Sequence, residues 1–576
     1  MKSLPVLFCL VIVSLTFGQI KAQLAIPKGY FSSPLHIPLS VTGSFAEVRA
    51  NHLHSGLDFS VQKKEGLPIY AVADGVVSRI KVSPFGFGNA LYIDHPNGFT
   101  SVYAHMKAYN DTITQYLRSK QYQQKSFEID LFPFNEKDII HVRKGQIIGY
   151  AGNSGSSEGA HLHFELRDTK TERIINPLLF DFELADHISP YIDFIKLYPE
   201  DNNSYISSSK KAMRLNLRKS PNNIYHLAFG DTISVWGSFS IGVQAFDFNQ
   251  SPSDRNGFYS LKMFADKAVV FSMQCDSFAF DETRFVNATI DYADSYNTDS
   301  RIVKSKKLPG NQLSLFTNTK SKGILNFSDN KTHELLILVA DEAGNTCQLR
   351  FWAKSQKPLG FTEIPPKPFP DSSVLIHYDK PGKVKTPEFI VEFPVGSLYE
   401  DIHFVHTIKP PTKGMYSNIC VLHNPEAPIH SKIKVSIKAD RLPQRLRNKA
   451  LLARMDREGK KTAVGGTYEN GYVTTNTNIF DGYVVVIDTV PPVIKPYPEN
   501  KQSHTMLRFS VSDNFSGIKK YKGEVNGQWA LISWDPKNKL MIYLFDKMTK
   551  QGKNTFKLTV EDDKGNKTSY STSFTK

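Results

Sequence analysis

The sequence predicts a mainly β protein made of several domains. Its 576 residues are too many for one hydrophobic core, so three or four domains are expected. Short runs of alternating apolar and polar residues, bounded by Asp-Gly and Pro-Asn-Gly turns, are typical of antiparallel strands. Two distant segments also begin and end alike, which indicates a repeated β module. We therefore predict an antiparallel-sheet domain followed by several β-sandwich-like modules.

The first 22 residues have the composition of a secretory signal. Lys2 precedes an apolar run that continues to Phe17, and a short exit segment ends at Ala22. Cys9 lies inside the apolar run and not at its end, so we expect no lipoprotein anchor. No later apolar stretch reaches the roughly 20 residues that span a bilayer. We expect an exported protein of the periplasm or cell envelope.

Residues 23–184 are the first predicted folded domain. Residues 69–77 contain strand-like runs interrupted by Asp-Gly, and residues 90–93 are expected to pair with residues 99–103 across a Pro-Asn-Gly turn. Antiparallel strands hold side chains rigidly, which a catalytic site requires. This domain also contains the residues that carry chemistry.

Five polar residues could form one open metal site with two further histidines beside it: His54, Asp58, His105, His161 and His163. Apolar and polar residues alternate around His161 and His163, so both project from the same strand face. His54 and Asp58 flank a glycine-containing turn and offer nitrogen and oxygen donors, which suit zinc. Bound zinc lowers the pKa of water from about 15.7 toward about 7. The pattern points to a hydrolase that activates water.

Three sequence blocks around these residues resemble the lysostaphin-type (LytM-type) zinc endopeptidases, which cut peptide cross-links in bacterial peptidoglycan. The blocks are residues 43–58, 103–106 and 149–165. The resemblance implies that zinc is bound by His54, Asp58 and His163. It implies that His105 and His161 flank the metal and assist catalysis. It further implies a groove between sheets with Zn2+ on its floor and peptidoglycan peptides as substrate.

The assisting histidines are expected to divide the acid and base work. We expect His161 to serve as base for the water, and His105 to stabilise the oxyanion or help protonate the leaving amine. The chain departs from the family pattern at Ala46, where glycine is more frequent, and at Met106, where leucine is usual. Nothing in the sequence argues for glycine recognition, so a direct cross-link is the favoured bond.

A long insertion separates the second and third blocks. Residues 107–140 contain six aromatic side chains among polar residues, where the family commonly needs a much shorter link. Long loops inside compact domains tend to be lids or mobile segments. The insertion is either a flap beside the substrate groove or a self-packed surface excursion.

Two other catalytic motifs are incomplete. Residues 152–156 faintly resemble a serine-protease nucleophile turn, but Asn153 stands where an aspartate is expected. The glycines and serines are better explained by a tight turn. Residues 333–337 begin like the His-Glu-x-x-His motif of helical zinc proteases and lack its second histidine. His52 has no matching role in the family and is expected to be a loop histidine.

The alternative function is a non-catalytic cell-wall-binding regulator or scaffold that activates other wall hydrolases. Some relatives of this family have lost metal ligands and act only in that way. Here every expected ligand is present, which favours an enzyme. A third possibility is an enzyme that its own insertion or C-terminal modules keep latent.

The rest of the chain reads as β modules. Residues 185–357 and 489–576 are predicted immunoglobulin-like modules, since both begin with a Pro-Tyr or Pro-Pro segment and close with strand, acidic Gly-Asn turn and strand. Residues 358–370 are a proline-rich linker, and residues 371–488 are a β-rich module of unknown type. The turn aspartates could be proposed as calcium ligands, but such turns form without a metal. They are Asp341, Asp562 and Asp563.

Charge and cysteines add weaker expectations. Residues 24–184 carry equal numbers of acidic and basic side chains, so most of the net charge of +14 lies in the C-terminal two thirds. That region is expected to have a mild affinity for anionic envelope polymers, and it lacks the basic-aromatic patterns of nucleic-acid modules. Cys275 and Cys347 could pair or remain buried free thiols, and with Cys420 they show no zinc-binding pattern.

Overall fold

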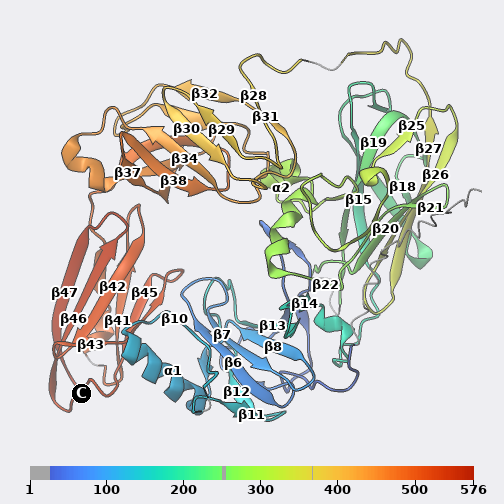
Figure 1. The fold of residues 1–576 in the computed structure, drawn as a ribbon. Coiled ribbons are helices and arrows are strands. Elements are labelled where there is room, and N and C mark those ends of the chain that lie inside the picture. The colour runs from blue at the N-terminus through green and yellow to red at the C-terminus, as the bar shows by residue number, and fades with distance from the viewer. Residues whose placement is uncertain (1–25, 136, 250–254, 366–367, 502) are drawn as a thin grey trace, which may run out of the picture.

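The computed structural model describes residues 26–135, 137–249, 255–365, 368–501 and 503–576 (Figure 1). The predicted signal segment, with Cys9, lies outside these residues. Strands contain 46% of the described residues and helices 9%, which confirms the prediction of a mainly β protein. None of the helices in the described ranges has the length and apolar character needed to cross a membrane.

The N-terminal domain is built on an antiparallel sheet whose central strand carries two of the candidate histidines. The strands, in spatial order, are β1 (Val41–Gly43), β4 (Leu57–Ser60), β13 (His161–Asp168), β8 (Phe99–Ala104), β7 (Asn89–Asp94), β6 (Gly75–Val82) and β10 (Ile129–Leu131). Along β13, Leu162, Phe164 and Leu166 are fully buried in the core. The intervening odd-numbered residues therefore share the opposite face. The expected pairing of residues 90–93 with 99–103 is present as β7 and β8.

The insertion at residues 107–140 folds into regular elements. Its first strand, β9 (Ala108–Tyr109), joins β12 (Ile147–Tyr150) and β5 (Pro68–Tyr70) in a three-stranded sheet. Helix α1 (Asp111–Gln124) begins at Asn110, whose side chain accepts a hydrogen bond from the Ile113 amide. After α1 the insertion forms β10, which pairs with β6. It is a packed part of the domain.

The following module shares its hydrophobic core with the N-terminal domain. At the edge of the N-terminal sheet, β14 (Ile174–Ile175) pairs with β22 (Ser277–Phe278) of the module. Phe45 stacks on Phe278 with 4.7 Å between ring centroids. One cluster of buried apolar side chains includes residues of both parts. Separating the two parts at residue 184 would expose apolar surface.

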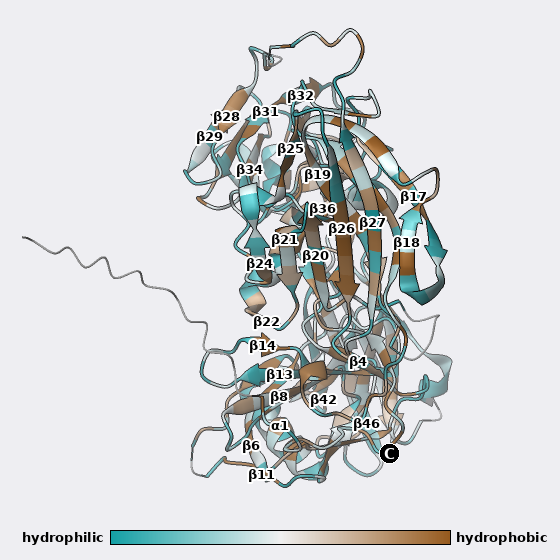
Figure 2. Ribbon diagram, turned by 90° about the vertical axis from the view of Figure 1, so that its right-hand side faces the viewer, coloured by the Kyte–Doolittle hydropathy of each residue, from teal (hydrophilic) through white to brown (hydrophobic). Residues whose placement is uncertain are grey.

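This module contains a twelve-stranded sheet. Its strands are β15 (Tyr191–Pro199), β16 (Tyr205–Ile206), β17 (Met213–Ser220), β18 (Ile224–Leu227), β19 (Thr232–Phe246), β20 (Ser260–Ala265), β21 (Ala268–Gln274), β23 (Val303–Lys304), β24 (Phe316–Thr319), β25 (Leu325–Phe327), β26 (Thr332–Ala340) and β27 (Thr346–Ser355). A short helix, α2 (Tyr292–Thr298), precedes β23. The apolar run of β26 stands out in Figure 2, and alternate residues along it are buried: Leu335, Ile337 and Val339.

Residues 371–488 fold around a separate core as two five-stranded sheets. One sheet consists of β29 (Gly382–Lys385), β30 (Phe389–Phe393), β34 (Ile433–Lys438), β38 (Tyr472–Thr477) and β37 (Thr467–Glu469). The other consists of β32 (His406–Lys409), β33 (Ile419–Leu422), β39 (Gly482–Ile487), β35 (Ala450–Met455) and β36 (Lys461–Gly465). A two-stranded pair, β28 (Val374–Ile376) and β31 (Ile402–Phe404), lies beside them.

The last module consists of two four-stranded sheets around its own core. They are β40 (Val493–Pro496), β41 (Met506–Ser512), β45 (Leu540–Leu544) and β44 (Ile532–Asp535), and β43 (Gln528–Ala530), β42 (Ile518–Val525), β46 (Lys553–Asp562) and β47 (Lys567–Thr575). This module, red in Figure 1, lies beside α1 of the N-terminal domain. Tyr122 of α1 donates a hydrogen bond to Asp546 and meets the Trp529 ring edge-on, with centroids 5.2 Å apart. The insertion therefore contacts the C-terminal module.

Candidate metal centre

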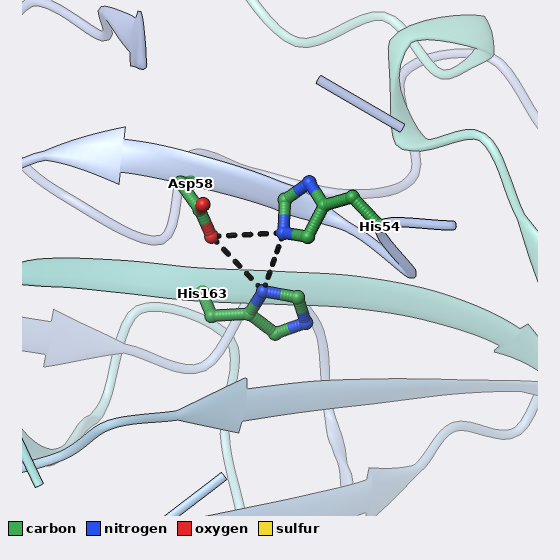
Figure 3. A group of neighbouring side chains, drawn as sticks. All are labelled: His54, Asp58 and His163. Carbon is green, nitrogen blue, oxygen red and sulfur yellow. Dashed lines mark hydrogen bonds and ion pairs between the residues drawn. The ribbon is translucent and has the colours of Figure 1, made fainter. Parts of the chain in front are cut away.

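Three predicted ligands converge on one point of the N-terminal sheet. Asp58 on β4 and His163 on β13 face each other directly in the strand register, and His54 lies in the turn before β4. The distances are 3.1 Å from His54 Nε2 to Asp58 Oδ1, 3.0 Å from His54 Nε2 to His163 Nδ1, and 3.0 Å from His163 Nδ1 to Asp58 Oδ1 (Figure 3). All three side chains are buried. They form a group of converging donor atoms that could hold a metal ion.

The hydrogen bonds outside the group decide which atoms are free to bind. His54 Nδ1 lies 2.7 Å from the Ser44 carbonyl oxygen, which can only accept, so Nδ1 carries the proton and Nε2 a lone pair. His163 Nε2 lies 3.1 Å from Glu165 Oε1, which leaves the lone pair on Nδ1. Two nitrogen lone pairs and a carboxylate oxygen thus face one another. A cation relieves their repulsion, and two imidazoles with one carboxylate suit zinc.

The electrostatics of the group agree with a need for positive charge. Burial opposes ionisation of Asp58, but the neighbouring His54, His161 and His163 hold its pKa well below its usual range. Burial also opposes a charge on His163, yet hydrogen bonds to Asp58 and Glu165 raise its pKa to about 9. Asp58 and Glu165 thus both favour positive charge at this position.

A second layer of charged residues holds the ligands in place. Glu165 is 0% exposed and accepts a hydrogen bond of 2.7 Å from Arg167 Nε. Burial opposes its charge, while Arg167 and His163 lower the pKa of Glu165 to about 2. Arg49 Nη2 lies 2.9 Å from Asp58 Oδ2, which leaves Oδ1 directed at the two histidines. No role was predicted for these residues from the sequence, although Glu165 and Arg167 continue the His161 and His163 face of β13 with the same period of two.

The structure brings the two predicted assisting histidines beside the ligand group. His161 Nδ1 donates to the Gly159 carbonyl oxygen at 2.9 Å, and its Nε2 lies 3.4 Å from Asp58 Oδ1. His105 follows β8 and donates from Nδ1 to the Ser154 carbonyl oxygen at 2.9 Å. Burial, followed by the neighbouring His163 and His161, lowers the pKa of His105 to about 3. The two rings lie 4.8 Å apart between centroids.

The backbone at His105 has a conformation that glycine usually adopts, with φ of 57°. Hydrogen bonds at both of its peptide groups maintain it: the His105 amide donates to Phe87 O at 2.9 Å, and His105 O accepts from Ser154 N at 3.3 Å. The surrounding loops therefore position this side chain.

All five residues line one cavity of 1690 Å³. One wall belongs to the N-terminal domain and includes Arg49 and Phe87, and the facing wall belongs to the next module and includes Arg255 and Phe280. The groove was expected between sheets of the N-terminal domain, but the next module forms much of it. None of the described residues of the 107–140 insertion lines this cavity. The insertion therefore does not act as a wall of the groove.

The last module reaches the loop that carries His161. Lys537 Nζ lies 3.0 Å from Asn153 Oδ1 and 2.8 Å from the Ser157 carbonyl oxygen. Ser157 Oγ in turn lies 3.3 Å from His161 Nδ1. The C-terminal module thus contacts Ser157, and Ser157 in turn contacts His161 beside the candidate metal centre.

The incomplete catalytic motifs, His52 and the cysteines do not form a second catalytic site in the described residues. Ser154 Oγ accepts a hydrogen bond from the Asn89 amide at 2.9 Å, in agreement with a tight turn at residues 152–156. His333 lies on a strand, β26, and contacts Asp266 and Asp329. His52 is exposed and stands outside the ligand group, although it lines the cavity. The cysteines are buried free thiols, so the disulfide alternative is wrong: Cys275, Cys347 and Cys420.

Comparisons with known proteins match two parts of the chain to two families. Residues 52–122, which include His54, Asp58 and His105, match peptidase family M23, and residues 373–488 match the Zu5-like domain. The DD-carboxypeptidase/endopeptidase Mpg of Neisseria meningitidis serogroup B is 35% identical over 115 residues, which cover 20% of this chain and 20% of that protein.

Two further relatives match the same part of the chain. Peptidoglycan DD-endopeptidase ShyA of Vibrio cholerae is 32% identical over 113 residues, covering 20% of each chain. Lysostaphin of Staphylococcus simulans is 27% identical over 139 residues, covering 24% of this chain and 21% of that protein. The chain thus spans about a fifth of the length of the curated relatives it matches. It carries at its N-terminal end an M23 peptidase domain like those of lysostaphin, Mpg and ShyA, followed by a Zu5-like domain and further β modules.

Proposed function

We propose that this chain is an exported, zinc-dependent endopeptidase that hydrolyses peptide cross-links of bacterial peptidoglycan. The observation that carries the proposal is the convergence of three donor atoms, from His54, Asp58 and His163, on the surface of a large cavity. Two relatives of the M23 region are named for endopeptidase activity on D,D bonds, which favours a direct cross-link as the bond. The predicted signal and the basic C-terminal modules support a place in the envelope, near anionic polymers.

The proposed ligands are held for a metal by their outer hydrogen bonds. Zinc, when bound there, supplies a Lewis acid for the peptide carbonyl and lowers the pKa of water. The Ser44 carbonyl fixes the ring of His54, and Glu165 fixes the ring of His163. Such outer partners keep the donor nitrogens directed at the metal and raise their basicity.

His161 is proposed as the general base. Its Nδ1 proton is engaged by the Gly159 carbonyl, so Nε2 is free to take the proton of the attacking water. Its Nε2 lies 3.4 Å from Asp58 Oδ1, which places this atom beside the proposed metal ligands.

His105 is proposed to act later in the reaction, on the oxyanion or the leaving amine. Its Nδ1 proton is engaged by Ser154, so Nε2 must first gain a proton before it can donate. Burial disfavours that charge in the resting protein, as the lowered pKa shows. Negative charge that develops on the substrate offsets this cost, so His105 contributes most in the transition state.

Arg255 is proposed to bind substrate from the facing module. It lines the cavity, its guanidinium lies 4.8 Å from the centre of the Phe246 ring, and it forms no ion pair with any described residue. Peptidoglycan stem peptides carry carboxylates, which an arginine can bind with two parallel hydrogen bonds. The second module would then be part of the substrate site.

The experiment uses the full chain, because the N-terminal domain shares its core with the next module. Purified protein is incubated with directly cross-linked or glycine-bridged peptidoglycan, before and after removal of zinc by a chelator and its restoration. Products are identified by mass spectrometry. We expect zinc-dependent release of peptides with new amino ends from the directly cross-linked material. If the zinc-loaded protein leaves both kinds of peptidoglycan uncut, the proposal is contradicted and the alternative of a non-catalytic regulator of other wall hydrolases is favoured.

A further inference from the structure

Three buried aspartates meet at one end of the module that follows the M23 domain. Asp186 lies in the segment that enters the module, Asp247 directly follows β19, and Asp341 directly follows β26. A carboxylate oxygen of each lies within 4.8 Å of the others. The residues are separated by more than 60 and more than 90 positions in the sequence, so the fold and not local sequence brings them together.

The hydrogen bonds of this group leave one buried carboxylate oxygen without a partner. Asp341 accepts from the amide and the side chain of Asn345, at 2.8 Å each, and Asp186 accepts from the Ile188 amide at 2.9 Å. Asp247 is 1% exposed, and its Oδ1 has no hydrogen-bond partner. No lysine or arginine in the described parts of the chain forms an ion pair with Asp186, Asp247 or Asp341.

Such an arrangement is costly without a positive charge. Burial, and then the charges of Asp186 and Asp341, raise the pKa of Asp247 to about 8. A buried carboxylate must be paired, protonated or bound to a metal, since transfer of an unpaired charge from water is highly unfavourable. The turn formed by Asp341 and Asn345 explains the position of Asp341, but it does not explain that of Asp247.

The last module repeats the same arrangement around a separate core. Asp488 directly follows β39 and enters the module, Asp513 directly follows β41, and Asp562 ends β46. They too place carboxylate oxygens within 4.8 Å of one another. Asp513 Oδ1 is again a buried atom without a partner.

The hydrogen bonds around the two groups correspond atom by atom. Asn345 Nδ2 donates to Asp341 Oδ2 at 2.8 Å and to Asp186 O at 3.3 Å. In the last module, Asn566 Nδ2 donates to Asp562 Oδ2 at 2.6 Å and to the Asp488 carbonyl oxygen at 3.1 Å. In both modules, one oxygen of the aspartate that follows a strand is buried without a partner, which points to a shared ligand.

We propose that each aspartate group binds one calcium ion, the first through Asp186, Asp247 and Asp341 and the second through Asp488, Asp513 and Asp562. Hard divalent cations take oxygen ligands, and each group offers three carboxylates. Two oxygens on opposite sides of a calcium ion, each at about 2.4 Å, are about 4.8 Å apart. The three oxygens of each group lie no farther apart than this, so one ion can contact all three.

The placement of the ligands gives the ions a structural task. Asp186 belongs to the segment between the M23 domain and its neighbour, and Asp488 directly follows the last strand of the Zu5-like domain. The remaining ligands belong to the module that follows in each case. Each ion thus fastens a module to the domain before it and limits the angle between them.

Calcium binding to the full chain tests this proposal directly. Protein freed of calcium by a selective chelator is titrated with calcium chloride, and in parallel with magnesium chloride, in a calorimeter. We expect two calcium ions per chain in the unchanged protein, one in Asp247→Asn, one in Asp513→Asn and none in the double variant. His163→Ala is the control, and it should still bind two, which separates these groups from the zinc site.

Thermal unfolding supplies a second readout that does not depend on stoichiometry. Calcium should raise the Tm of the unchanged protein by several degrees, since a ligand that binds only the folded state stabilises it, and should not raise the Tm of the double variant. Asparagine has the shape of aspartate and removes the repulsion, so the variants should fold, which circular dichroism checks. Absence of binding at millimolar calcium, or two ions in the double variant, would overturn the proposal. So would a Tm that asparagine raises and calcium leaves unchanged, because the carboxyls would then be protonated.

Discussion

The candidate zinc centre and the two aspartate groups differ in their donor atoms and in their access to the cavity. The zinc centre combines two nitrogens with one oxygen, and its residues line a large cavity. The aspartate groups offer only oxygens at the ends of strands, and none of their residues lines that cavity. Sites with an open position suit catalysis, whereas closed sites contribute to folding. A group of possible ligands therefore has to be assigned from its donor atoms together with its access to a cavity.

The largest effect is expected from removing a zinc ligand. In His163→Ala the nitrogen opposite Asp58 is gone, so zinc binding and peptidoglycan cleavage should both fall to background. Metal content by mass spectrometry and product release measure the two losses. His52→Ala is the matched control, because His52 lines the same cavity outside the ligand group, and it should retain zinc and activity. Loss of zinc in the control would show that the cavity, and not the ligand group, determines metal binding.

The next largest effect separates proton transfer from metal binding. His161→Ala should lower kcat by about 10²-fold to 10⁴-fold, the usual contribution of a general base. Zinc content should remain near one per chain, because the three ligands are intact. Metal analysis and kinetics on the same preparation test both statements. If His161→Ala loses its zinc, His161 is a ligand and the proposed division of roles is wrong.

A smaller effect is expected from the residue behind His163. Glu165→Gln keeps the shape and weakens the hold on the His163 ring, so zinc affinity should fall by about 10-fold to 100-fold. Activity should be low at limiting zinc and recover in excess zinc. Competition with a chromophoric chelator measures the affinity. A loss of activity that excess zinc does not restore would assign Glu165 a role beyond holding the ligand.

A still smaller effect is expected from the facing module. Arg255→Ala should raise KM for a cross-linked peptide about tenfold with little change in kcat, because one charged hydrogen-bond partner of the substrate is lost. Steady-state kinetics on a soluble peptide fragment provides the test. An unchanged KM would place the substrate against the M23 wall alone.

The smallest effect is expected at the contact of the last module. Lys537→Ala removes the bonds to Asn153 and Ser157, and because Ser157 contacts His161, kcat should change by no more than a few fold. Lys539→Ala, in the same exposed turn, is the control. A large gain in activity for Lys537→Ala alone would instead show that the docked module keeps the enzyme latent.

Local patterns allowed the candidate ligands to be predicted from the sequence. The alternation in β13 places His161 and His163 on one face, and the glycine turn brings His54 and Asp58 close, so short segments contain most of the information. Glu165 follows from the same alternation. Arg255 does not, because its place opposite the M23 domain depends on packing between residues more than a hundred positions apart.

The aspartate groups could also be recognised only in part from the sequence. Asp341 and Asp562 were recognised because their Gly-Asn turns repeat, and they were interpreted as turn residues alone. Asp247 and Asp513 follow ordinary strands and carry no local signal. Only the folded modules bring each of them to a turn aspartate, and only then does the unpartnered oxygen become visible.

Titration of the metal-free full chain with zinc tests whether His54, Asp58 and His163 form a catalytic metal centre. Bound zinc and turnover of a directly cross-linked peptidoglycan fragment are measured at each step. Turnover should rise in proportion to bound zinc and reach its plateau at one ion per chain, and the chemical step should not depend on calcium. Full turnover without zinc, or no turnover at one zinc per chain, would contradict the assignment of His54, Asp58 and His163 as the catalytic metal centre.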